Sequence, residues 1–132
     1  MSIKVLAIDD DPGMTQLIKL FLKNDQFDVC VINSGLEGIE IARRWQPDII
    51  VLDLMMPVMS GWEVCREIRA FSQIPILILS VITEEELLIQ ALVNGANSHI
   101  SKPITKKELV ANIVKLSKQA QTNDPSNAEL EK

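Results

Sequence analysis

The chain has 132 residues, of which 47% are hydrophobic, and a formal net charge of −5 at pH 7. This size fits one domain with a single real core. With 18 acidic against 13 basic residues, the chain has no basic surface for wrapping a phosphate backbone, so we expect no direct binding of nucleic acid. No apolar stretch approaches the roughly 20 residues of a membrane span. The start Met-Ser-Ile-Lys also lacks the apolar core of a secretion signal, so the sequence predicts a cytoplasmic protein without a membrane segment.

Short apolar runs alternate with longer segments of helical period along the chain. This alternation predicts repeated βα units around a parallel sheet, which is a three-layer, doubly wound α/β fold with five strands and five helices. The expected strands are mostly continuous Val, Ile and Leu, as strands covered on both faces require. They are residues 4–8, 28–32, 49–52, 76–79 and 98–101.

The helices between these strands are marked by apolar residues at helical spacing and by capping residues. The apolar positions are Met14, Leu17, Ile18, Phe21 and Leu22, then Ile39, Ile41 and Ala42, then Val64, Ile68 and Phe71, then Leu87, Leu88, Ala91 and Leu92, and finally Leu109, Ile113 and Leu116. The expected helix starts are Pro12, Ser34, Ser60, Thr83 with Glu86, and Thr105 with Glu108, and Gly95 is expected to close the fourth helix.

Polar residues follow four of the expected strands. Asp9 and Asp10 end the first strand, Asp53 the third and Ser80 the fourth, and Lys102 follows the fifth. Because the carboxyl ends of parallel strands meet at one edge, where open α/β sheets place ligands, we expect these side chains to converge. Carboxylates of this kind suit Mg²⁺, and a lysine with a hydroxyl suits phosphoryl oxygens, so the pattern predicts phosphoryl transfer.

Some neighbours of these residues are expected to have structural roles. Asp11 precedes Pro12, so we interpret it as a helix-capping carboxylate and leave it out of the site. Met55, Met56 and Met59 are expected to pack rather than bind a metal through sulfur, because the nearby ligands are hard oxygens. The two cysteines, Cys30 and Cys65, form no C-x-x-C pair and are expected to be reduced packing residues.

Together these segments resemble the receiver domain of bacterial response regulators, the phosphoacceptor half of two-component signalling. The resemblance runs from about residue 3 to about residue 118, and its motifs are Ile-Asp-Asp-Asp at 8–11, Asp-Leu-Met-Met-Pro-Val-Met-Ser-Gly at 53–61, Ser80, and Lys-Pro at 102–103. It implies a flavodoxin-like sheet of order 2-1-3-4-5 and a receiver domain over residues 1–118. From Gln119 the sequence loses its apolar period, so residues 119–132 are expected to form a polar tail or linker.

The resemblance implies a role for each carboxylate. Asp53 would be the phosphoacceptor, taking a phosphoryl group from a sensor histidine kinase or a phosphotransfer protein. Asp9, Asp10, Asp53 and the main-chain carbonyl of Met55 would bind Mg²⁺. Such a protein is a switch that catalyses its own phosphorylation and slow dephosphorylation, rather than an enzyme that turns over a substrate.

The resemblance also implies a switch. Lys102 would pair with the phosphoryl oxygens and Ser80 would turn to hydrogen-bond the phosphoryl group. His99, at the position of the usual aromatic residue, would then move inward. A phosphoryl group would in this way shift the domain from one of two conformations to the other.

The implied partners include an effector domain or partner protein on the face formed by the fourth helix, fifth strand and fifth helix. In the winged-helix branch of the family this face forms a homodimer through charged pairs. Here Asn97 stands where that branch tends to have aspartate, and Asn112 lies where it tends to have arginine. The usual pairs cannot form, so a homodimer would need other contacts.

Val81 also departs from the commonest pattern, in which a small residue, usually alanine, follows the switch hydroxyl. Its branched side chain is expected to narrow access to Asp53 and to slow phosphorylation by small donors.

Two other classes remain as alternatives. A phosphatase of the haloacid dehalogenase type also uses an aspartate and Mg²⁺, but its D-x-D-x-T/V motif is incomplete at residues 9–13 and no room is left for a cap domain. A receiver that has lost its chemistry and works only through protein contacts would lack an acidic residue or the lysine, and none is lacking. A flavodoxin-like cofactor binder is disfavoured because no glycine-rich phosphate loop follows the first strand.

Overall fold

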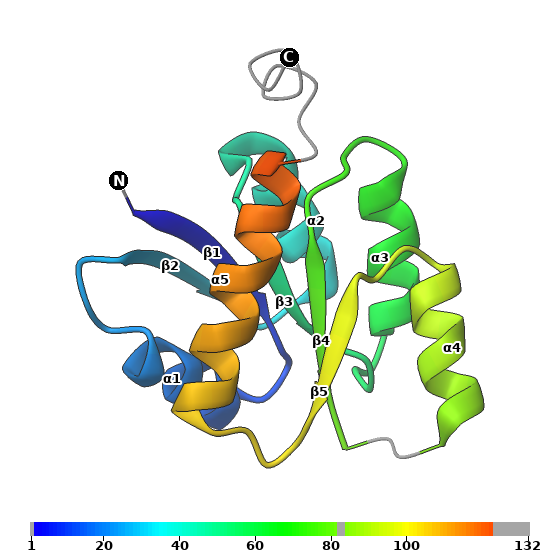
Figure 1. Ribbon diagram of the computed structural model, residues 1–132. Helices are drawn as coiled ribbons and strands as arrows, with labels where there is room; N and C mark the ends of the chain where they lie inside the picture. The colour runs from blue at the N-terminus through cyan, green and yellow to red at the C-terminus, as the bar shows by residue number, and fades with distance from the viewer. Residues whose placement is uncertain (1, 82–83, 123–132) are drawn as a thin grey trace.

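A computed structural model describes residues 2–81 and 84–122 of the chain (Figure 1). Strands and helices alternate throughout this part, as the sequence predicted. The expected cap at Thr83 lies outside the described residues. The elements are β1 (Ile3–Ile8), α1 (Pro12–Phe21), β2 (Phe27–Ile32), α2 (Gly35–Trp45), β3 (Ile49–Asp53), α3 (Gly61–Arg69), β4 (Ile76–Ser80), α4 (Glu85–Val93), β5 (Ser98–Ser101) and α5 (Lys106–Thr122).

The strands form one parallel sheet of order β2-β1-β3-β4-β5, which confirms the predicted topology. In the register, Ile8 at the end of β1 lies opposite both Ile32 and Leu52, and Asp53 lies opposite Leu79. The chain begins at β1, continues to β2 at one edge, and then crosses back to β3. The strand order therefore reverses between β1 and β3, which is where doubly wound sheets place their ligand crevice.

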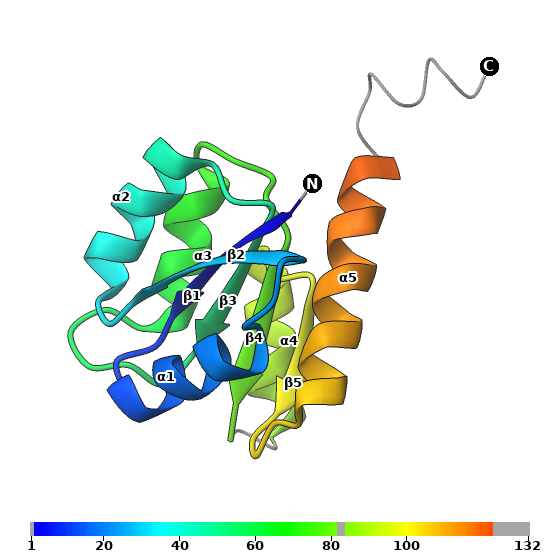
Figure 2. The same ribbon diagram turned by 90° about the vertical axis from the view of Figure 1, so that its left-hand side faces the viewer.

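Helices cover both faces of the sheet, so its strands are continuous apolar runs. Figure 2 shows α2 and α3 on one side of the sheet and α5 on the other. One core layer joins the sheet to α1 and α5 through Ile18, Leu22, Leu109, Ile113 and Leu116. The other joins it to α2, α3 and α4 through Ile39, Ala42, Val64, Ile68 and Ala91.

Side-chain caps start four of the helices where the sequence predicted. Asp11 accepts a hydrogen bond from the N–H of Gly13 before α1, which confirms its capping role. Ser34 and Ser60 cap α2 and α3 by accepting from the N–H three residues later, and Thr105 accepts from the N–H of Glu108 at α5. These bonds satisfy N–H groups that a helix start leaves without a partner.

The last helix is longer than the apolar pattern indicates. The predicted tail begins at residue 119, but α5 continues to Thr122. Lys118, Gln119 and Ala120 are good helix formers, and a helix can extend on such residues after its apolar face has ended. Loss of the apolar period therefore marks the end of packing and not the end of the helix.

Two further expectations concern the membrane and the thiols. Among the described residues, no helix is both long and apolar enough to cross a membrane. Cys30 and Cys65 are both free, Cys65 on α3 is buried in the core, and Cys30 packs partly buried against it, so their predicted packing role is confirmed.

Candidate functional site

Three carboxylates meet at the carboxyl edge of the sheet. Asp9 follows β1 and Asp53 ends β3, and their neighbouring strands leave these residues only 2% and 6% exposed. Asp10 is exposed beside them. One oxygen from each of the three lies within 4.8 Å of the others. The cluster could hold a metal ion.

Lys102 brings a positive charge to this cluster from the loop after β5, the strand at one edge of the sheet. It follows β5, and its main-chain N–H donates to the carbonyl of Ser80 at 2.9 Å. Its Nζ lies 3.2 Å from Asp9 Oδ2 and 3.4 Å from Asp53 Oδ1. A single ammonium is therefore shared by two buried carboxylates. The peptide bond from Lys102 to Pro103 is cis.

The electrostatic balance of the cluster is negative. Burial raises the pKa of Asp53, the charge of Asp9 raises it further, and Lys102 and the main-chain N–H of Met55 only partly oppose them. Burial also raises the pKa of Asp9, against hydrogen bonds from Asp11 N–H and Lys102. Burial lowers the pKa of Lys102, but the two carboxylates outweigh it, and the net shift is upward. A second positive charge would relieve this repulsion.

The other predicted site residues lie on β4 and β5 and in the loops after β3 and β4, and they differ in exposure. Ser80 ends β4, is 1% exposed, and pairs in the sheet with Ser101. Val81, the next residue, is 66% exposed. His99 is exposed on β5, opposite Ile78. Met55 is 58% exposed, and its main chain hydrogen-bonds the carboxylate of Asp53.

Asn33 supports the site but was not predicted. It follows β2, and its Nδ2 donates to the carbonyl of Asp9 at 2.7 Å and to the hydroxyl of Thr15 at 3.1 Å. The hydroxyl of Thr15 donates in turn to the carbonyl of Pro12. Asn33 thus fixes the turn that carries the first two aspartates. The signal available in the sequence was an amide directly after a strand, at the same edge as the aspartates.

Gly61 lies in the predicted motif at residues 53–61, but its role in the site was not predicted. Its N–H donates to the carbonyl of Leu54 at 2.9 Å, and a Cβ at this position would collide with the carbonyl oxygen of Asp53. The start of α3 therefore lies directly on the main chain of Asp53. The signal available was a glycine one residue after the helix-capping Ser60.

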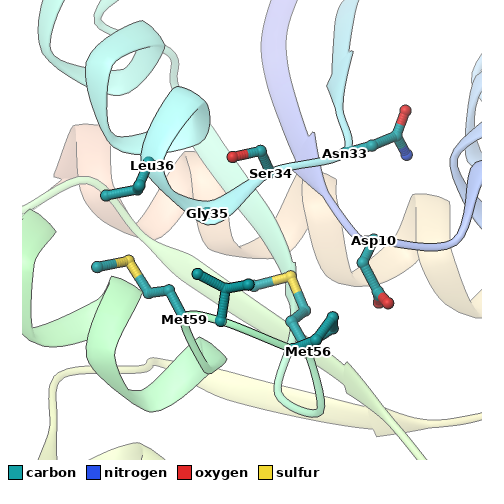
Figure 3. Close-up of a pocket in the computed structure, with 9 residues that line it drawn as sticks. Asp10, Asn33, Ser34, Gly35, Leu36, Met56 and Met59 are labelled. Carbon is teal, nitrogen blue, oxygen red and sulfur yellow. The ribbon is translucent and has the colours of Figure 1, made fainter.

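A pocket of about 180 Å³ lies beside the cluster, between the loops after β2 and β3. Figure 3 shows Met56 and Met59 on one side of it, Leu36 on the other, and Asp10 at its end. Both methionines also pack against the core layer under α2 and α3. The predicted packing role is therefore confirmed for these two methionines and wrong for Met55, which is 58% exposed.

Comparison with known proteins places this geometry in a family. The family model described as the response regulator receiver domain matches residues 5–114, which is most of the chain. The chain belongs to the response regulator receiver family. Receiver domains act in two-component signalling, so the family prediction is confirmed and the phosphatase alternative is rejected.

The curated relatives of this receiver domain include two bacterial regulators. The chain is 37% identical over 110 residues to the DNA-binding response regulator MtrA of Mycolicibacterium smegmatis, covering 83% of this chain and 48% of that protein. It is 42% identical over 111 residues to the cell cycle response regulator CtrA of Brucella ovis, covering 83% of this chain and 48% of that protein. The chain thus spans about half the length of these relatives.

Solved receiver structures have the same fold. The Francisella response regulator 1452 receiver domain has a TM-score of 0.84 at 30% identity, over 90% of this chain and 99% of that one. The chemotaxis protein CheY4 of Vibrio cholerae has a TM-score of 0.83 at 29% identity, over 88% of this chain and 99% of that one. These structures agree with the predicted flavodoxin-like sheet.

Asp53→Asn should raise the free energy of unfolding of the metal-free protein at pH 7 by about 1 kcal/mol, the scale of a relieved repulsion between partly buried charges. Because the folded-state pKa of Asp53 is raised, the native state binds this proton more tightly than the unfolded state does. The destabilisation of the folded state by the ionised carboxylate of Asp53 is then absent below the ordinary pKa of 3.8. It is fully present above the raised pKa. Urea unfolding in EDTA across pH should therefore show the gain vanishing as the pH falls towards 3.8.

The matched control is Asp11→Asn, since asparagine caps a helix about as well as aspartate and Asp11 lies outside the cluster. It should leave the unfolding free energy nearly unchanged at every pH. An Asp53→Asn protein less stable than the unchanged one at pH 7 would contradict this account of the site.

Proposed function

We propose that Asp53 accepts a phosphoryl group from a phosphohistidine of a sensor histidine kinase or phosphotransfer protein. The observation that carries this proposal is a carboxylate at the end of β3, 6% exposed, with Lys102 Nζ at 3.4 Å and two further carboxylates beside it. In the reaction, Asp53 attacks phosphorus, a P–O bond forms and the P–N bond to the imidazole breaks. The leaving imidazole takes a proton from solvent.

We further propose that the cation held here is Mg²⁺. Asp9, Asp10, Asp53 and the main-chain carbonyl of Met55 would hold it, and the donor set is made of hard oxygens. The ion would neutralise part of the negative charge on the phosphoryl oxygens. The upward shift of the pKa of both buried aspartates supports the fit, because burial penalises their charges, Asp9 adds repulsion at Asp53, and Lys102 does not offset the two effects.

The remaining site residues would act through charge and position. Lys102 holds the carboxylate of Asp53 in place before transfer, and its ammonium is close enough to pair with a phosphoryl oxygen afterwards. Ser80, at the end of the neighbouring strand, would donate a hydrogen bond to the phosphoryl group. His99 would change position in response. Its exposure on β5 supports a role in which it turns inward from the surface.

The output of the switch would lie outside this domain. Relatives about twice as long are named DNA-binding response regulators, so we propose that the receiver, residues 1–118, controls an effector region or partner protein through a linker or docked surface. The docking face would be α4, β5 and α5, where Ile89, Leu92 and Val93 of α4 are exposed. A homodimer on this face would use these apolar residues. The reaction would take place in the cytoplasm, where phosphodonors made from ATP are available.

The direct test is phosphorylation by a small donor. With acetyl phosphate and Mg²⁺, the protein should gain the mass of one phosphoryl group, and peptide mapping should place it on Asp53. Omission of Mg²⁺, or excess EDTA, should reduce the rate at least tenfold, because charge neutralisation is the main catalytic term in this chemistry.

Two variants serve as controls for this experiment. Asp53→Asn removes the nucleophile and should abolish labelling, whereas Asp11→Asn leaves the cluster intact and should label at the unchanged rate. Absence of any mass gain in the unchanged protein would leave a binding-only receiver as the better interpretation.

Val81 generates a prediction about rate. Val81→Ala removes two methyl groups from the residue that follows Ser80, and relief of crowding by about 0.5 to 1 kcal/mol would speed labelling by acetyl phosphate about two- to fivefold. Mass spectrometry of the intact protein, in reactions stopped at successive times, would measure the two rates. Equal rates in Val81→Ala and the unchanged protein would show that Val81 does not limit access to Asp53.

A further inference from the structure

Helix α3 holds both ends of helix α4, which lies beside it (Figure 1). At the N-terminal half of α4, the indole Nε1 of Trp62 donates a hydrogen bond to the carbonyl of Leu87 at 3.2 Å. Just beyond the C-terminal end, Nε of Arg69 donates to the carbonyl of Gly95 at 3.0 Å. Trp62 and Arg69 lie near opposite ends of α3, so one helix fixes the other at two points.

The attachment at Arg69 is the stronger one. Its guanidinium also donates to the carbonyl of Ser72 at 3.1 Å and to Oδ1 of Asn97 at 2.9 Å, and the same amide oxygen accepts from the N–H of Ile76 in β4 at 2.8 Å. Gly95 adopts φ +113°, and a Cβ there would collide with the arginine side chain. The C-terminal end of α4 is therefore joined to the sheet through several bonds.

The attachment at Trp62 is the weaker one. The N-cap of α4, Glu84, makes no side-chain capping bond. Ala91 is the buried residue of the helix, and Leu88 is only partly buried against the same core layer as Trp62. Among the residues that the structure describes, one neutral hydrogen bond and this packing hold the first turns of α4 to the rest of the domain. Such a contact can be lost at modest cost.

Trp62 is next in sequence to a residue that contacts the main chain of Asp53. It follows Gly61, whose N–H bonds the carbonyl of Leu54 and whose missing Cβ allows α3 to lie against the carbonyl of Asp53. Because even a Cβ at Gly61 would collide with this main chain, Asp53 and Leu54 have little room to move without moving the start of α3.

We propose that Trp62 is a positioning residue that couples the main chain at Asp53 to the first turns of α4. The inference rests on the proposed function, since it requires a change at Asp53. A phosphoryl group on Asp53 adds bulk and negative charge and displaces the main chain that Gly61 contacts. Trp62 moves with it, its bond to Leu87 is lost, and α4 turns about the end that Arg69 holds.

Hydrogen exchange of Trp62→Phe tests the coupling, because phenylalanine keeps an aromatic ring in the core and removes the indole N–H. In the unchanged protein, Mg²⁺ with beryllofluoride, a mimic of the phosphoryl group, should speed exchange in residues 84–93. In Trp62→Phe, exchange there should already be faster without beryllofluoride, by about two- to tenfold, the factor expected from one lost neutral hydrogen bond. Adding beryllofluoride should then change it little.

Trp45→Phe is the matched control. Trp45 lies at the end of α2, where Nζ of Lys4 lies 4.9 Å from the centroid of its ring. The substitution should leave exchange in α4 and its response to beryllofluoride unchanged. The chain has two tryptophans and no tyrosine, so Trp62 is the only strong emitter in this variant. Its emission should change when beryllofluoride and Mg²⁺ are added, a signature that a merely structural tryptophan would lack.

The outcomes separate the two proposals. If acetyl phosphate labels Asp53 but Trp62 emission and α4 exchange do not respond to beryllofluoride, the coupling is overturned and the proposed function stands. Equal exchange of α4 in Trp62→Phe and the unchanged protein, in both states, also overturns it. If Asp53 is not labelled at all, the proposed function fails and the coupling fails with it. The fluorescence arm decides the matter even if Trp62→Phe does not fold.

Discussion

Asp9 and Asp53 are two buried carboxylates at the ends of adjacent strands, and a single ammonium lies between them. Burial raises the pKa of both carboxyl groups, the charge of Asp9 raises that of Asp53 further, and Lys102 only partly opposes these shifts. A domain that keeps this arrangement gives up stability at neutral pH in return for a site that favours an added cation. The rest of the structure holds these three groups in place.

The sheet order explains how a short chain brings them together. Crossing from β2 back over β1 to β3 makes the first and third strands neighbours, and β4 and β5 then carry Ser80 and Lys102 to the same edge. Local bonds complete the positions. The N–H of Asp11 donates to the carboxylate of Asp9 at 3.0 Å, and Asn33 holds the main chain of the same turn.

The strands, their parallel arrangement and the convergence of Asp9, Asp53, Ser80 and Lys102 could be predicted from the sequence, because apolar runs and the polar residues that end them are local features. The contacts that Asn33, Gly61 and Arg69 make could not, since each joins segments that only the folded chain brings together. The end of α5 at Thr122 was missed for a different reason. Helix propensity continued after the apolar period had ended.

The central claim is that the repulsion among these carboxylates makes a specific cation site, and thermal unfolding against Mg²⁺ concentration tests it most directly. An ion that binds only the folded state stabilises it by about 2.7 kcal/mol at one hundred times its dissociation constant. The melting temperature of the unchanged protein should rise steadily with Mg²⁺, and that of Asp10→Asn, which lacks one carboxylate of the cluster, should rise far less. Equal rises in the two proteins, or no rise in the unchanged protein, would contradict the account.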